Sequence, residues 1–225
     1  MEGYRVETAK APMREILHFL GWRGSAVEEK LAEEIREAAQ EMEAQCEPRL
    51  IIRRLPLSEG KAQNAEFVPL GKDIEELLSD CPEMILMAAT LGSACDRFLQ
   101  RWQVKDPAHA LLLDAAASAT IEAILDREEA ELRKKARTEG LFLTDRFSPG
   151  YGDMPLSQGR EICEVLETGK RIGLAVSMSG IMIPQKSVTA VMGLCTHSKP
   201  RRPGPCTTCN ARGHCQLRRT ETDYV

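Results

Sequence analysis

The residues between positions 146 and 155 combine a guanidinium, a phenol and a carboxylate with two prolines and two glycines. Proline fixes φ and glycine permits backbone conformations that other residues avoid, so this pattern predicts a stiff loop. Arg146 can bind a carboxylate through two hydrogen bonds, and Tyr151 can lie against a cationic or aromatic group. Gly150 and Gly152 would expose backbone amides and carbonyls. We expect a loop that holds a small zwitterion, or else an ordinary turn, which Pro-Gly sequences usually mark.

The sequence of this loop, Arg146-Phe-Ser-Pro-Gly-Tyr-Gly-Asp-Met-Pro155, resembles a loop in the activation (reactivation) domain of cobalamin-dependent methionine synthase. In that family an Arg-x-x-x-Gly-Tyr-x-x-x-Pro loop holds S-adenosylmethionine. A helix, a strand and a segment similar to Met182-Ile-Pro-Gln-Lys-Ser-Val-Thr189 follow it. The stretch 84–92 and the alanine-rich helix 114–131 are also similar to the family, and the likeness covers roughly residues 40 to 195.

The resemblance implies a set of S-adenosylmethionine-binding residues. Arg146 would pair with the methionyl carboxylate, and a helical glutamate of the family aligns with Glu122, whose charge would favour the sulfonium or amino cation. Glu122 could equally be an ordinary acid on a helix surface. The adenosyl end would be held by Gly150, Tyr151, Gly152 and Asp153. At Asp153 the family offers backbone contacts, so the side chain can be incidental there.

The implied function is reductive methylation of cob(II)alamin to methylcobalamin. The chain carries no Asp-x-His-x-x-Gly signature of a cobalamin-binding module and is too short for the methionine synthase catalytic modules. We therefore expect the cobalamin on a separate corrinoid protein, with methionine synthase as the favoured partner and a flavodoxin- or ferredoxin-type electron donor. Whether the chain is an enzyme itself stays open. The alternatives are an activator of another corrinoid methyltransferase system and a metal-binding electron-transfer accessory.

A short tail rich in Cys, Pro and Gly follows position 194 and predicts a division into a domain at 1–194 and a tail at 195–225. Such a segment cannot bury a core, so a shared metal is expected to hold it together. The alternatives are zinc, an iron–sulfur cluster, which we favour slightly, and a metal-free tail with reactive thiols. The expected ligands are Cys195, Cys206, Cys209 and Cys215, with His197 and His214 as substitutes. Four scattered cysteines, Cys46, Cys81, Cys95 and Cys163, are expected mostly as buried free thiols.

Hydrophobic periodicity predicts helices and non-adjacent strands without a regular βαβ order, which favours an α+β fold. The resemblance implies the same class, with a twisted, mainly antiparallel sheet flanked by helices. A capping box at Ser25 and Glu28 predicts one helix start, and Asp106-Pro107 predicts another. Helices are expected at 11–22, from 25, at 73–79, from 93, at 106–138 and at 157–167; strands are expected at 50–57, 84–90, 141–144, 171–176 and 187–194.

Composition excludes several classes of function. The 30 basic and 34 acidic residues give a net charge of −4, and aromatic residues make up 4% of the chain, so we expect no nucleic-acid partner. No apolar run reaches the length of a membrane span, and no secretory signal is evident, so we expect a cytoplasmic protein with no membrane partner. The chain also lacks the glycine-rich loop of classical methyltransferases and the Cys-x-x-x-Cys-x-x-Cys run of radical S-adenosylmethionine enzymes.

Overall fold

The computed structural model describes residues 3–22, 26–58, 61–62, 66–199 and 213–214. Its main element is an antiparallel sheet in the order β1-β2-β4-β8-β5, with β3 paired to β2. A separate hairpin joins β6 to β7. The strands are β1 Tyr4–Arg5, β2 Arg49–Ser58, β3 Lys61–Ala62, β4 Glu83–Thr90, β5 Phe142–Leu143, β6 Ala175–Val176, β7 Met182–Ile183 and β8 Ser187–Cys195.

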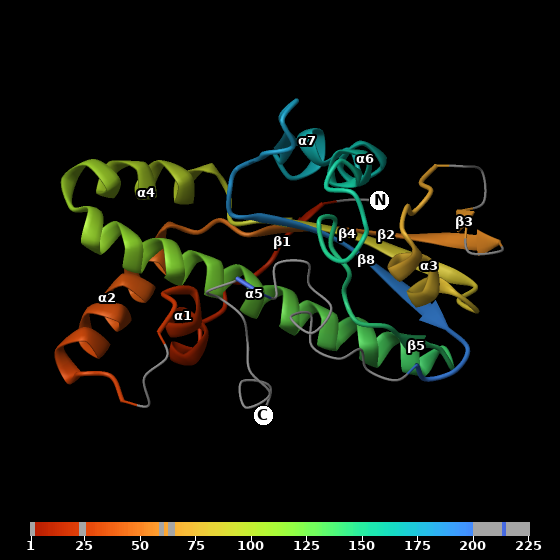
Figure 1. The fold of residues 1–225 in the computed structure, drawn as a ribbon, viewed down its shortest axis with the longest axis horizontal. Helices are drawn as coiled ribbons and strands as arrows, with labels where there is room; N and C mark the ends of the chain where they lie inside the picture. Colours follow the sequence, from red (N-terminus) through yellow and green to blue (C-terminus); the bar gives the residue numbers. More distant parts are fainter. Residues whose placement is uncertain (1–2, 23–25, 59–60, 63–65, 200–212, 215–225) are drawn as a thin grey trace.

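Helices cover both faces of the sheet (Figure 1), so the expected α+β class is confirmed. One face carries α1 Met13–Phe19, α2 Glu29–Gln45, α4 Ser93–Lys105 and α5 Pro107–Thr138. The other face carries α3 Lys72–Leu78, α6 Gln158–Val165 and α7 Thr168–Arg171. Two apolar cores therefore form, one on each side of the sheet.

Strand β4 lies at the centre of the sheet and contributes to both cores. Its side chains alternate between the faces, as the two-residue repeat of a strand requires. Ile85 and Met87 pack on the α5 side, whereas Met84 and Leu86 pack on the α3 side. Burial on both faces explains why this segment is a continuous apolar run in the sequence.

Helix α5 begins and ends as predicted. The Asp106 carboxylate accepts hydrogen bonds from the amides of Ala108 and His109, and Gly140 follows the helix with a φ of +76°. Within the described residues, α5 is long and apolar enough by length and composition to cross a membrane. However, 56% of its most apolar window is buried inside the fold, as in the core helix of a soluble protein.

Two predicted elements differ from the structure. The helix expected from Ser25 begins at Glu29, with Glu28 at its N-cap and no side-chain cap; Ser25 itself lies outside the described residues. The strand expected at 171–176 is wrong, because its first residue ends α7 and only the short β6 remains. There the Thr168 hydroxyl donates to the carbonyl of Leu174 at 2.6 Å, which closes a tight turn where the sequence pattern predicted extended chain.

Candidate functional site

The loop from Ser148 to Met154 is built from hydrogen-bonded turns. The amide of Tyr151 donates to the carbonyl of Ser148 at 3.2 Å. Pro149 and Gly150 are the central residues of this turn, and Gly150 has a φ of +91°, as the glycine of a type II turn requires. A second turn follows, in which the amide of Met154 donates to the carbonyl of Tyr151. The predicted stiffness thus has a defined structural origin.

The loop is fastened to the first turn of α3. The carboxylate of Asp153 accepts hydrogen bonds from the amides of Lys72 at 2.8 Å and Asp73 at 3.1 Å. These two amides hold the pKa of Asp153 below its usual range. Gly152 has a φ of +54°, and a Cβ there would lie 2.1 Å from Oδ2 of Asp73. Glycine is therefore required where the loop meets α3.

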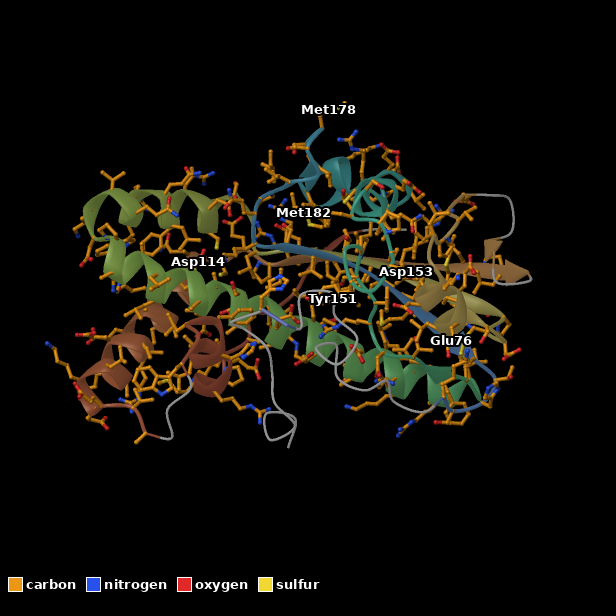
Figure 2. The ribbon with its side chains drawn as sticks, viewed as in Figure 1. Glu76, Asp114, Tyr151, Asp153, Met178 and Met182 are labelled. Atoms are coloured by element: carbon orange, nitrogen blue, oxygen red, sulfur yellow. A yellow bond between two sulfur atoms is a disulfide. The ribbon has the colours of Figure 1, made fainter. Side chains whose placement is uncertain are left out.

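These contacts change one expectation for the loop, at Gly150, and agree with another, at Asp153. The amide of Gly150 donates to the carbonyl of Met154 at 3.0 Å, so it is not exposed for a ligand as expected. The side chain of Asp153 holds α3, so any part it has in a ligand site would come from its backbone. In Figure 2, Tyr151 projects on the α5 side of the loop and Asp153 on the α3 side. The phenol is half-exposed on this surface.

The guanidinium of Arg146 contacts three carboxylates of α5. Its Nη2 lies 2.6 Å from Oδ1 of Asp126 and 3.4 Å from Oε2 of Glu122, and its Nε lies 3.1 Å from Oε2 of Glu129. Arg146 was expected to face a ligand carboxylate, and these internal ion pairs occupy two of its three nitrogens. The third, Nη1, is buried and has no hydrogen-bond partner within the described residues.

Helix α5 presents a row of polar side chains to this part of the fold. Lys186, at the start of β8, reaches the row with Nζ 2.8 Å from Oδ1 of Asp114 and 2.8 Å from Oγ of Ser118. The row consists of Asp114, Ser118, Glu122, Asp126 and Glu129, spaced three or four residues apart on one helical face. Its four carboxylates meet three cations, Lys186, Arg146 and, at Glu129, Arg133, so the face keeps a negative charge.

Three further buried polar atoms have no hydrogen-bond partner within the described residues: Oδ1 of Asp96, Oγ1 of Thr189 and, away from the loop, Nε2 of His109, which lies 3.3 Å from Oε1 of Glu41. The other oxygen of Asp96 accepts from the amide of Gln185 at 2.8 Å, just before β8. Thr189 lies within β8, and two residues later Val191 pairs with Phe147, which adjoins Arg146. Buried polar groups without partners are rare in native proteins, so the occurrence of Asp96, Thr189 and Arg146 beside β8 marks a candidate ligand site.

Sequence reasoning missed most of the polar residues around Arg146. Of the row on α5, only Glu122 was singled out, and Lys186 was quoted only as part of a similar segment. The sequence did contain a signal, because the acids at 114, 122, 126 and 129 recur at a spacing that places them on one face of a helix. Arg146 and Glu122 were expected in one site, and the structure places Nη2 of Arg146 3.4 Å from Oε2 of Glu122.

The cysteine expectations need one correction. Cys195 was expected to bind a metal, but it lies buried in β8 and forms a disulfide with Cys81, which was expected to be free. The cause is the strand register. Glu83 of β4 pairs with Leu194 of β8, so Cys81, just before β4, and Cys195, at the end of β8, lie close together. Cys206, Cys209 and Cys215 lie outside the described residues. No group of three or more potential metal-binding side chains (His, Cys, Asp or Glu) occurs in the part of the chain that the structure describes.

The remaining three cysteines, Cys46, Cys95 and Cys163, are free thiols as expected. Cys95 and Cys163 are buried. The pKa of Cys95 is raised by its hydrogen bond with Cys46 and by burial, and burial raises the pKa of Cys163. Raised pKa values keep these thiols protonated and unreactive.

No protein-family model matches the chain, and neither does any curated protein sequence. Among solved structures, the chain is similar to the crystal structure of the MetH reactivation domain bound to AdoHcy (S-adenosylhomocysteine). The match has a TM-score of 0.65 at 16% identity and covers 89% of this chain and 80% of that one. At this identity the comparison establishes the fold, which is the fold that the loop sequence predicted.

Proposed function

We propose that the chain binds S-adenosylmethionine and supports the reductive methylation of cob(II)alamin on a separate corrinoid protein. One observation carries the proposal: Arg146 and the doubly hydrogen-bonded loop after it stand in a fold shared with a domain that was solved with AdoHcy. The sequence of that loop resembles the loop that holds S-adenosylmethionine in the same family.

The charges beside the loop support a zwitterionic, cationic ligand. S-adenosylmethionine carries a sulfonium, an ammonium and a carboxylate. The carboxylates of Glu122, Asp126 and Glu129 outnumber the two guanidiniums that they contact, those of Arg146 and Arg133, and Arg133 is shared with a further acid, so this surface favours the two cations. The ligand carboxylate would bind Nη1 of Arg146. It could also displace Asp126, whose side chain is 71% exposed and therefore weakly held.

The proposed contribution of the protein is positioning. The corrinoid substrate, reduced to cob(I)alamin by one electron from a flavodoxin- or ferredoxin-type donor, attacks the methyl carbon. The carbon–sulfur bond breaks, its electron pair stays on sulfur, and AdoHcy and methylcobalamin result. Loss of the positive charge on sulfur weakens the pull of Glu122, which helps product release. The stiff loop would hold the methyl group in line with the attacking metal.

The surface around the loop is suited to contact with another protein. Leu156 packs near Gly150 and Gly180, and exposed apolar side chains continue from it onto the β6–β7 hairpin. They are Tyr151, Leu156, Met178, Ile181 and Ile183, and Figure 2 places Met178 at the outer end of this hairpin. Exposed apolar patches of this kind mark interaction sites. We assign this patch to the corrinoid protein, with methionine synthase as the favoured partner.

The binding step can be tested by titration calorimetry with S-adenosylmethionine and AdoHcy. Arg146→Ala is expected to abolish measurable binding, while Arg36→Ala is the control, since Arg36 lies on α2 in an exposed ion pair with Glu29. Thermal unfolding of each variant separates lost binding from lost folding. Unchanged affinity in a folded Arg146→Ala variant would remove Arg146 from the site.

The whole function can be tested by mixing. The protein is combined with a partner loaded with cob(II)alamin, a low-potential reductant and S-adenosylmethionine, and methylcobalamin is followed by its absorption. Formation of methylcobalamin that depends on the protein is the expected result. An equal rate without it would refute the proposal.

A further inference from the structure

The disulfide between Cys81 and Cys195 joins the corner between α3 and β4 to the last residue of β8. Cys81 lies two residues before β4, and the register of β4 on β8 brings it to the end of β8. Gly193 leaves the necessary room, because a Cβ there would lie 2.7 Å from Sγ of Cys81. The sulfur atoms are thus brought together by sheet register and by a glycine.

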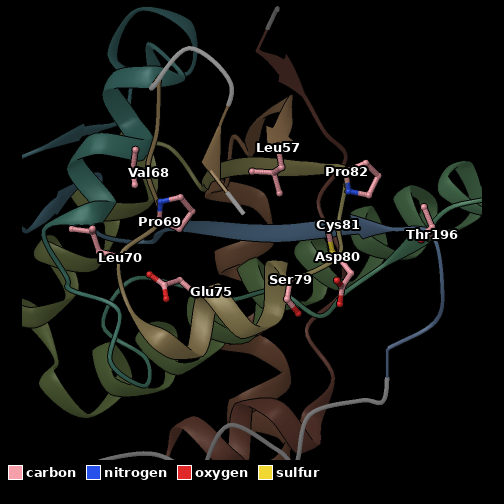
Figure 3. A pocket seen from close by; sticks show the side chains of 10 residues that line it. All are labelled: Leu57, Val68, Pro69, Leu70, Glu75, Ser79, Asp80, Cys81, Pro82 and Thr196. Carbon is pink, nitrogen blue, oxygen red and sulfur yellow. The ribbon is translucent and has the colours of Figure 1, made fainter. Parts of the chain in front are cut away.

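A cavity of about 1020 Å³ is lined in part by Cys81, one of the two cysteines of this bond. Cys81 and Thr196, the residue after Cys195, both line it, although Cys81 is only 5% exposed. Figure 3 shows Cys81 beside Ser79 and Asp80, with Glu75 of α3 at the other end of the cavity, on the side of Leu70. The other lining residues are mainly apolar: Leu57, Val68, Pro69, Leu70 and Pro82.

Helix α3 connects the disulfide to the candidate ligand loop. Its C-terminal end adjoins Cys81 and is further held by Lys199, whose Nζ donates to the carbonyl of Leu77 at 3.1 Å. Its N-terminal amides, from Lys72 and Asp73, are held by the carboxylate of Asp153 in the loop. Helix α3 has only seven residues and is held at both ends, so it links the corner at Cys81 to the loop.

We propose that Cys81–Cys195 is a thiol–disulfide exchange site whose reductant is a dithiol entering through this cavity. One thiolate of the dithiol attacks Sγ of Cys81 and forms a mixed disulfide, and Cys195 leaves as a thiolate that takes up a proton. The second thiol of the dithiol then attacks the mixed disulfide and releases Cys81. Two electrons and two protons pass to the protein, and the dithiol becomes a disulfide.

The lining of the cavity selects the reductant. Glu75 and Asp80 line it, and one cation, Nζ of Lys199, lies 2.9 Å from Oγ of Ser79, so the lining keeps a negative charge, which repels thiols that carry additional negative charge. A neutral dithiol is therefore favoured over glutathione. In the reducing cytoplasm, where we propose the chain acts, disulfides are usually transient and catalytic or redox-sensing, and a buried disulfide with one cysteine at the wall of a cavity matches that class.

Reduction is expected to loosen α3 and, through Asp153, the loop. The effect on ligand affinity rests on the proposed function, whereas the exchange chemistry does not. The oxidised form holds the loop in its turn conformation and binds S-adenosylmethionine; the reduced form binds it more weakly. A protein that prepares a corrinoid for methyl transfer would thereby respond to the thiol redox state of the cell.

The exchange is tested on the full chain by alkylating free thiols after incubation with dithiothreitol or glutathione, followed by peptide mass spectrometry. Dithiothreitol is expected to add two labels, at Cys81 and Cys195, without unfolding, and glutathione is expected to react more slowly. The double variant Glu75→Gln, Asp80→Asn should reduce the difference in reaction rate between dithiothreitol and glutathione. A bond that is reduced only after denaturation, or two thiols already free under oxidising conditions, would overturn the proposal.

The link to the loop is tested by hydrogen exchange of the oxidised and reduced forms. Faster exchange at Lys72, Asp73 and the loop is expected after reduction and in the double variant Cys81→Ser, Cys195→Ser; Cys163→Ser is the control. Identical exchange in both forms would refute the link. Calorimetry on the same samples shows whether affinity follows. If neither form binds S-adenosylmethionine, the proposed function fails, while the labelling and exchange results stand on their own.

Discussion

Replacing Glu122 with glutamine separates the charge of the ligand from the rest of the site. The substitution keeps the shape of the side chain and removes one negative charge from the row on α5. S-adenosylmethionine has a positive sulfur, while AdoHcy has a neutral one and is otherwise nearly identical. If Glu122 faces the sulfonium, Glu122→Gln must weaken binding of S-adenosylmethionine more than binding of AdoHcy.

The expected size follows from Coulomb's law and the exposure of Glu122. Two unit charges 4 Å apart interact by about 1 kcal/mol in water and about 4 kcal/mol near a protein surface. The Glu122 side chain is 39% exposed, so we expect a value on the order of 1–2 kcal/mol, or roughly a 5- to 30-fold selective loss. Loss of the contact between Glu122 and Arg146 affects both ligands equally and cancels in their ratio.

The assay is calorimetric titration of the wild type and the variant with both ligands. Glu131→Gln is the matched control, because Glu131 lies on the same helix in an exposed pair with Lys134, outside the row. Raising the salt concentration should reduce the selective loss, since a partly exposed pair is screened. An equal loss for both ligands, or none, would refute the assignment of Glu122 to the sulfonium.

Other substitutions test the loop and the tail. Gly152→Ala should destabilise the fold by roughly 1–3 kcal/mol in urea unfolding, and by more than Gly140→Ala, whose φ is also positive but whose Cβ would meet open space. Asp153→Asn should lower the free energy of unfolding at neutral pH. Because folding lowers the pKa of Asp153, the difference in stability between wild type and variant is complete above the unfolded-state pKa of about 3.9. It disappears as the pH falls through the pKa of Asp153 in the folded protein. The expectation of a metal in the tail, from which Cys195 is now removed, is tested on protein purified without oxygen: a metal content that falls in the double variant Cys206→Ser, Cys209→Ser would support it. Visible absorption by the metal-containing protein would identify an iron–sulfur cluster, and a bound metal without visible absorption would indicate zinc. Equal metal content in the wild type and the variant would exclude Cys206 and Cys209 as ligands.

The sequence by itself determined most of the secondary structure and the identity of the loop. Helix α5 could be bounded from Asp106 and Gly140, because a cap and a stop act within a few residues of themselves. The turn at Pro149 and Gly150 is local for the same reason, since those two residues fix its backbone. The apolar run of β4 already indicated a strand buried on both faces. These features depend on neighbours along the chain, which a sequence displays directly.

Only the tertiary structure decided which groups face one another. Nothing local to Arg146 indicates that Asp126 and Glu129, about twenty residues away, would take up its nitrogens, because their meeting depends on how α5 packs beside the loop. Likewise, the pairing of Cys195 with Cys81, 114 residues earlier, follows from the register of β4 on β8. Such contacts are set by long-range packing of the whole sheet and its helices, so the residue types could name the participants but not their partners.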